Sequence, residues 1–215
     1  MIRKSLLMAL VVVVLLSSSM VVFAQEYWAW NTFNAQEERF KYEVVSRTSE
    51  WDYEVGEEVW IENRQYQTLE LRRIDDSTYE VTTGYTFNLP SDELGDKLSF
   101  MGGTIGLSML FGAGDWFGEL MMLGFFASDL ELEVGNSMQT FDGSRIKVVE
   151  KMTVAGVDGY FATKHRRDTD ESGGRVDILT SEWVFAPDVG WPLLVRIYEE
   201  DQVVYSMELV EYSRK

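Results

Sequence analysis

The chain has no cysteine, only one histidine and only three prolines among its 215 residues. Without cysteine it can form no disulfide and carries no thiol for a lipid anchor. Zinc sites of the common kinds need several Cys or His ligands, so we expect no metal site. The lone His165 would have to serve any Ser-His-Asp triad, and no G-x-S-x-G nucleophile motif is present. We therefore expect no catalytic residues, no cofactor and no enzyme activity.

Basic residues are also scarce. The sequence has 19 Lys and Arg against 36 Asp and Glu, which gives a formal net charge of −17. Such a surface repels the phosphates of nucleic acids, so a nucleic-acid partner is not expected. It also repels anionic lipid headgroups, and its strong net charge favours a soluble chain.

The first 24 residues have the three parts of a secretory signal peptide. Arg3 and Lys4 provide the positive charge, an apolar run follows from Leu6, and Val22 and Ala24 place small side chains where signal peptidase cuts. Cleavage after Ala24 would leave residues 25–215 as a single β-rich domain, periplasmic or secreted, with no stable membrane span. The alternative is an uncleaved anchor, because the apolar stretch is long enough to cross a bilayer.

Alternating apolar and polar residues then predict strands. Phe40, Tyr42 and Val44 fall on one face of a strand, whereas Lys41 and Glu43 fall on the other. Similar patterns, separated by short turns, predict further strands at 57–75, 79–87, 145–152, 160–168, 175–185, 193–199 and 203–212. Short turns join antiparallel neighbours. The fold class is therefore mainly β (α+β), a curved antiparallel sheet or half-barrel of about eight or nine strands.

One segment, residues 98–127, departs from this pattern. It holds seven glycines and four methionines, with Asp115 and Glu119 as its only charged residues. The spacing predicts two short apolar helices around 98–111 and 115–127, separated by a glycine-rich break and packed in the concave side of the sheet. Three interpretations remain open. The segment spans a membrane, fills the core, or lines a cavity for a lipid-like ligand.

Three stretches of the second half resemble a known family. They are Val154–Phe161 (VAGVDGYF), Glu182–Leu193 (EWVFAPDVGWPL) and Met207–Tyr212 (MELVEY). In this order they resemble exported bacterial domains of the LolA-like type and the related DUF3108-like proteins. The resemblance implies a half-barrel wrapped round helices, with an apolar interior that holds lipid or lipoprotein acyl chains. It implies no catalytic residues.

Two polar motifs have simple explanations. Asp168-x-Asp170-x-Ser172-Gly173 begins like a calcium-binding loop, but Leu179 occupies the twelfth position, where such loops need a glutamate. We interpret it as a solvated hairpin turn. Adjacent acidic residues could be glycosidase acids only if two carboxylates faced each other across a cleft. With so many acidic residues, a solvated face is the default interpretation.

The leading functional hypothesis is an exported, non-enzymatic protein that binds a lipid or acyl chain. The candidate wall residues are Phe100, Met101, Met109, Phe111, Trp116, Phe117, Met121, Met122, Phe125 and Phe126 from the insertion, and Tyr79, Val81, Tyr85 and Phe87 from the sheet. The alternative is a cell-envelope structural or interaction module with a filled core and no ligand. Such a module would dock an envelope protein through an edge strand or the aromatic segment 25–37. A hydrolase that uses acidic residues is a third hypothesis.

The signal-peptide interpretation predicts the N-terminus of the exported protein. After export from a bacterial host, the mature chain should begin at Gln25, as measured by N-terminal sequencing and intact mass. An Ala24→Leu variant should keep residues 1–24, because signal peptidase requires a small side chain at that position. A wild-type chain that retains Met1 in the membrane fraction would support the uncleaved anchor instead.

Overall fold

The computed structural model describes residues 26–28, 32–53, 55–87, 130–169, 173–199 and 201–215. The predicted signal peptide (1–24) and the predicted helical insertion (98–127), with its ten candidate wall residues, lie outside these ranges. The described residues form strands, turns and irregular segments but no helix. Consequently, nothing in this part of the chain is a helix long and apolar enough to span a membrane.

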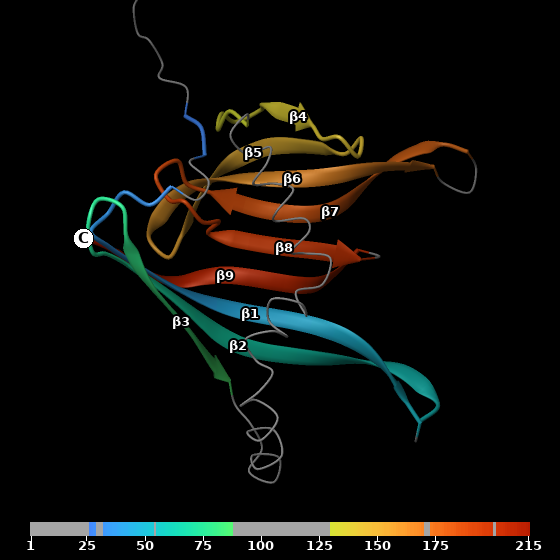
Figure 1. Ribbon diagram of the computed structural model, residues 1–215. Coiled ribbons are helices and arrows are strands. Elements are labelled where there is room, and N and C mark those ends of the chain that lie inside the picture. Colours follow the sequence, from blue (N-terminus) through green and yellow to red (C-terminus); the bar gives the residue numbers. More distant parts are fainter. Residues whose placement is uncertain (1–25, 29–31, 54, 88–129, 170–172, 200) are drawn as a thin grey trace, which may run out of the picture.

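Nine strands form one antiparallel sheet with the order β3-β2-β1-β9-β8-β7-β6-β5-β4 (Figure 1). The strands are β1 (Glu37–Asp52), β2 (Glu57–Arg73), β3 (Tyr79–Phe87), β4 (Ser137–Gln139), β5 (Arg145–Val154), β6 (Val157–Thr169), β7 (Arg175–Phe185), β8 (Leu194–Glu199) and β9 (Gln202–Arg214). The sheet therefore consists of two meanders, β1–β3 and β4–β9, joined by the pairing of β1 with β9. It is twisted and open, with β3 and β4 as the outer strands of the described sheet.

Alternation along the strands separates an inner face from an outer face. Phe40, Tyr42 and Val44 are all at most 5 % exposed and define the inner face, whereas Lys41 and Glu43 lie on the outer face. The register continues the inner face across six neighbouring strands. The row of directly opposed, buried side chains is Val44, Met207, Val195, Trp183, Ala162 and Val148. This row forms the centre of the hydrophobic core.

Segments outside the strands cover part of the core. The indole Nε1 of Trp28 donates a hydrogen bond to the carbonyl of Val189 at 2.8 Å, and its ring lies 4.3 Å from that of Phe185. Leu130 and Leu132 are also buried. Trp28, from the aromatic segment 25–37, therefore packs against the body of the sheet.

The predicted antiparallel β fold is confirmed, and most strand limits agree with the expectation within three residues. Strand β4 was not predicted; it has only three residues and pairs with the start of β5. The candidate wall residues Tyr79, Val81, Tyr85 and Phe87 all belong to β3. The calcium-like motif lies at the β6–β7 hairpin, where Asp168 is in β6, and its residues 170–172 are not described.

Tyrosines within the sheet make stability sensitive to high pH. Burial, then the nearby Tyr212 and Glu38, raises the pKa of Tyr42. Burial also raises the pKa of Tyr205. Burial and a hydrogen bond to Glu38 raise the pKa of Tyr212. Burial, with a hydrogen bond to Glu182, raises the pKa of Tyr198 to about 12. In each case the folded state favours the neutral phenol.

We expect the free energy of unfolding to fall as the pH rises above about 10, the ordinary pKa of tyrosine. Above that pH the unfolded chain loses phenolic protons that the folded protein still holds. The stabilisation that these tyrosines provide is therefore fully present below about pH 10 and declines toward about pH 12. Urea unfolding at several pH values measures this decline. Tyr205→Phe should make it shallower, and an unfolding free energy that is constant over this range would contradict the prediction.

Candidate functional site

A pocket with a volume of about 280 Å³ opens on the inner face of β1–β3. Its lining residues are Phe33, Tyr42, Gln67, Leu69, Leu71, Thr83 and Trp191. We call it the inner pocket. Strands β1, β2 and β3 provide its floor, and two aromatic residues from outside the strands, Phe33 and Trp191, provide the rest of its described wall.

The floor follows from strand alternation and register. Gln67, Leu69 and Leu71 are every second residue of β2, so they share the inner face. Leu69 lies between Phe40 of β1 and Thr83 of β3. Thr83 is smaller than the large residues expected for a cavity wall, and it occupies the outer strand of the sheet. A short side chain at this position leaves space above Leu69.

Hydrogen bonds to the backbone anchor the two segments that carry Phe33 and Trp191. The hydroxyl of Tyr79 donates a 2.7 Å hydrogen bond to the carbonyl of Phe33, and the Phe33 ring meets that of Phe40 edge-on at 6.4 Å. On the other side, the Tyr42 hydroxyl donates to the carbonyl of Pro192, next to Trp191, at 3.1 Å. Two tyrosines of the sheet thus fix the two segments that carry the aromatic wall.

Gly190 marks the point where these two segments touch. A Cβ atom at position 190 would lie 2.6 Å from the carbonyl oxygen and 2.8 Å from the amide nitrogen of Thr32. Both atoms belong to the backbone, so neither can rotate away. Only glycine therefore permits the segment before Phe33 to rest on the segment before Trp191.

The inner pocket offers neutral groups for binding. None of its described lining residues carries a charge. Burial raises the pKa of Tyr42 and that of Tyr85, whose hydroxyl accepts a 3.2 Å hydrogen bond from Gln67 Nε2. Neutral phenols and an amide can orient a ligand, but they provide neither a carboxylate nor an imidazole for acid–base chemistry. The arrangement is suited to holding an apolar group.

Of the candidate wall residues of β3, Tyr79, Val81 and Tyr85 are not among the described lining residues of this pocket. Tyr79 positions Phe33, and Tyr85 bonds to the lining residue Gln67. Val81 lies opposite Leu71 and is 57 % exposed, while Phe87 is the last residue of β3, opposite Gln65. None of the seven described lining residues is among the predicted wall residues. The aromatic segment 25–37 and the Gly190–Pro192 turn were the available signals for Phe33 and Trp191.

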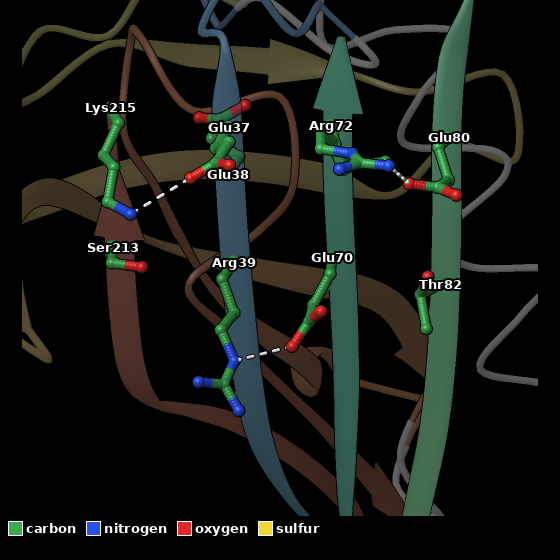
Figure 2. Close-up of a pocket in the computed structure, with 10 residues that line it drawn as sticks. Glu37, Glu38, Arg39, Glu70, Arg72, Glu80, Thr82, Ser213 and Lys215 are labelled. Carbon is green, nitrogen blue, oxygen red and sulfur yellow. Dashed lines mark hydrogen bonds and ion pairs between the residues drawn. The ribbon is translucent and has the colours of Figure 1, made fainter. Parts of the chain in front are cut away.

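A second, charged cleft of about 450 Å³ lies at one end of β1, β2, β3 and β9 (Figure 2). Its cationic side chains are each paired with a carboxylate inside the cleft. The pairs are Arg39–Glu70 at 2.9 Å, Arg72–Glu80 at 2.5 Å and Lys215–Glu37 at 3.1 Å. Because these three pairs are exposed and neutralise one another, none of their six side chains offers a ligand an unbalanced charge. We therefore regard the inner pocket as the candidate site.

Glu38 contributes to this cleft but directs its carboxylate to the inner face. It shares that face with Phe40, and its Oε1 accepts a 2.7 Å hydrogen bond from Tyr212, whose ring packs on Phe40. Arg214 Nε lies 3.7 Å from the same oxygen. The other oxygen, Oε2, is buried without a hydrogen-bond partner among the described residues. Within the same residues, no group of three His, Cys, Asp or Glu is arranged to hold a metal ion.

No protein-family model and no curated protein matches the chain. The similarity to LolA-like domains is therefore not confirmed. Among solved structures, the chain is similar to a presumed exported protein with a YmcC-like fold from Bacteroides fragilis. The identity is 7 %, the alignment covers 89 % of this chain and 100 % of the other, and the TM-score is 0.31. A similarity at this level carries no functional argument.

The close contact at Gly190 predicts a specific sensitivity. Gly190→Ala should destabilise the protein by about 1–3 kcal/mol, because the new methyl group forces the two backbone segments apart. It should also change tryptophan fluorescence, since Trp191 is the adjacent residue. Gly84→Ala is the matched control: a Cβ there meets nothing within 4 Å. Equal unfolding free energies for the two variants in urea would contradict the proposed role of Gly190.

Proposed function

We propose that the protein is an exported, non-enzymatic binding protein that holds a single apolar chain, such as a lipid acyl chain, in the inner pocket. The observation that carries this proposal is the pocket itself. Four of its seven described lining residues are large and apolar, and the remaining three are uncharged. Its location on the inner face of the sheet separates it from the outer face, which carries ion pairs such as Arg39–Glu70 and Lys41–Glu211.

The size of the pocket limits the ligand. A volume of about 280 Å³ is near the lower end of the range for small-molecule sites, roughly 300–1,000 Å³. This supports a single chain or a small ring rather than a branched molecule with several tails. Apolar burial contributes roughly 25 cal/mol per Å², so burial of about 200 Å² of ligand would provide about 5 kcal/mol before entropic costs. Uncharged walls would not discriminate between headgroups.

A pair of adjacent threonines provides the test. Thr83 faces the inner pocket, whereas Thr82 lies next to it on β3 but faces the opposite side. Thr83→Trp should fill the pocket and weaken binding of a dansyl-labelled fatty acid by at least about tenfold, which corresponds to about 1.4 kcal/mol. Thr82→Trp should bind like the wild type. Fluorescence titration of the mature chain, residues 25–215, measures both affinities.

Two controls make the result decisive. Urea unfolding should show that both variants are folded, because each position belongs to an exposed part of the outer strand. Organic extraction of the purified protein followed by mass spectrometry should recover a bound lipid from the wild type and less from Thr83→Trp. Absence of saturable binding and of extracted lipid would overturn the proposal and favour the envelope interaction module. Equal weakening in both threonine variants would place the ligand elsewhere.

A further inference from the structure

The β1–β2 hairpin extends beyond the two strands that flank it, β9 and β3 (Figure 1). The pairing of β1 with β9 ends at Ser46, and the pairing of β2 with β3 ends at Gln65. From Arg47↔Glu62 to Asp52↔Glu57, β1 and β2 pair only with each other among the described strands. We call residues 47–62 the hairpin arm. An isolated pair of strands is at best marginally stable in water, so this arm needs support from elsewhere.

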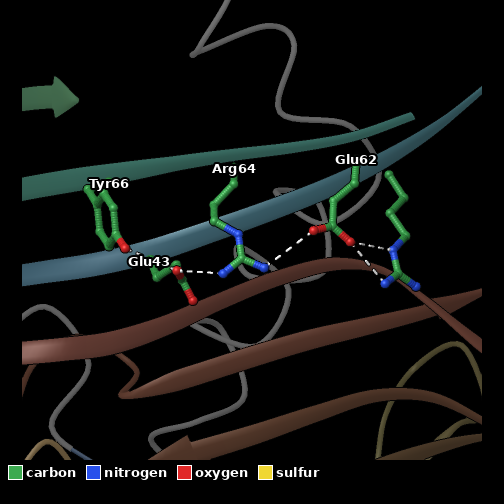
Figure 3. Close-up of polar contacts among 5 residues, drawn as sticks. Glu43, Glu62, Arg64 and Tyr66 are labelled. Carbon is green, nitrogen blue, oxygen red and sulfur yellow. Dashed lines mark hydrogen bonds and ion pairs between the residues drawn. The ribbon is translucent and has the colours of Figure 1, made fainter. Parts of the chain in front are cut away.

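Ion pairs brace the base of the arm on the outer face (Figure 3). Arg47 donates to Glu62 through Nε and Nη2 at 3.2 and 3.0 Å. Arg64 donates hydrogen bonds to both Glu62, at 3.3 Å, and Glu43, at 3.0 Å. The hydroxyl of Tyr66 donates to the same Glu43 oxygen. The hydrogen bonds from Arg47 and then Arg64 lower the pKa of Glu62. This row of exposed ion pairs connects the base of the arm to the body.

Beyond the brace, the arm exposes large apolar side chains. Trp51 is 56 % exposed and Trp60 is 50 % exposed, and both lie on the outer face, diagonally across the strand pair. Tyr53 and Val55, in the turn, are 91 % and 64 % exposed. Tryptophan and tyrosine are the residues most enriched at the energetic centres of protein interfaces. Their concentration on a braced projection favours a contact surface.

The charge of the arm selects among partners. Between Arg47 and Arg64 the sequence has six acidic residues and no Lys or Arg. Asp52 and Glu57 are directly opposed in the register, and Glu58 lies opposite Trp51. Like charges opposed across strands destabilise a hairpin, and nearby cationic groups would reverse this effect. Cationic side chains can also stack on the exposed aromatic rings.

From these observations, we infer that the hairpin arm is a docking element for a basic protein surface. Lysine or arginine side chains of the partner pair with Glu58, which shares the outer face with Trp51 and Trp60, and with Glu57, which lies on the opposite face beside the turn. Apolar groups of the partner pack on the two tryptophans. This contact lies outside the inner pocket and does not depend on a ligand there. An anionic membrane is disfavoured by the charge of the arm, and the same charge opposes arm-to-arm association of two copies.

The test uses a defined basic probe. A fluorescein-labelled peptide of six Lys-Leu repeats is titrated with the mature chain, and anisotropy gives the Kd at low and moderate salt. Trp51→Ser/Trp60→Ser and Glu57→Gln/Glu58→Gln should each weaken binding by at least about tenfold. The glutamine pair should also reduce the salt dependence, because it removes two of the paired charges. Asp52 is left unchanged because its side chain accepts a hydrogen bond from the Val55 amide in the turn.

Matched variants outside the arm separate docking from general charge attraction. Glu133→Gln/Glu150→Gln removes the same charge, and Val134→Ser/Phe141→Ser removes exposed apolar groups from the two turns on either side of β4. Both should bind within about twofold of the wild type. Urea unfolding of each variant checks that its fold is intact.

Three results would overturn the inference. The first is an equal loss of peptide binding in the arm variants and the matched variants. The second is that the protein binds uncharged phosphatidylcholine vesicles through Trp51 and Trp60 but does not bind the peptide. This result would identify a lipid surface as the partner. The third is a concentration-dependent dimer in sedimentation that Trp51→Ser/Trp60→Ser abolishes, which would identify a second copy. None of these measurements depends on the fatty-acid titration, so the two proposals can fail separately.

Discussion

The pairing of β1 with β9 is the interaction on which the rest of the structure depends. The first three strands and the last six are separate meanders, and in the described sheet this seam is the only ladder between them. At its centre Val44 lies opposite Met207, which places both in the row of buried residues that crosses the sheet. At its end Phe40 lies opposite Tyr212, with a register shift between Lys41 and Tyr42. A bulge of this kind increases local twist.

The seam also determines where a cavity can form. On the β4–β9 side, Trp28, Leu130 and Leu132 are buried together with the inner face and belong to its hydrophobic core. On the β1–β3 side, only Phe33 and Trp191 of the described non-strand residues line the wall above the floor. The outer face of the same strands carries ion pairs such as Arg39–Glu70 and Lys41–Glu211. Each exposed pair is worth less than about 1 kcal/mol, so their main effect is to keep this face solvated.

The sequence predicted the strands well because alternation is a local signal, and β3 is the clearest case. It did not predict β4, since three residues are too few for a pattern. Local sequence patterns could not predict the pocket either, for a different reason. Phe33 and Trp191 come from opposite ends of the chain, and the Tyr42–Pro192 hydrogen bond joins residues 150 positions apart. Sequence reasoning also favoured large residues as walls, whereas the cavity depends on a small one, Thr83, between Val81 and Tyr85.

Glu38 shows how the seam sets one boundary of the inner pocket. Its register partner on β2 is Leu71, a lining residue, so a buried carboxylate lies directly beside the apolar floor. Tyr212 and Arg214 both approach Oε1, and the buried Oε2 has no hydrogen-bond partner among the described residues. An unsatisfied buried group of this kind costs about 1–3 kcal/mol of stability. An apolar chain extended past Leu71 would meet this carboxylate and lose favourable burial. The favourable path therefore runs the other way, along Leu69 and Gln67 toward Tyr85, where the polar groups are neutral and already hydrogen-bonded.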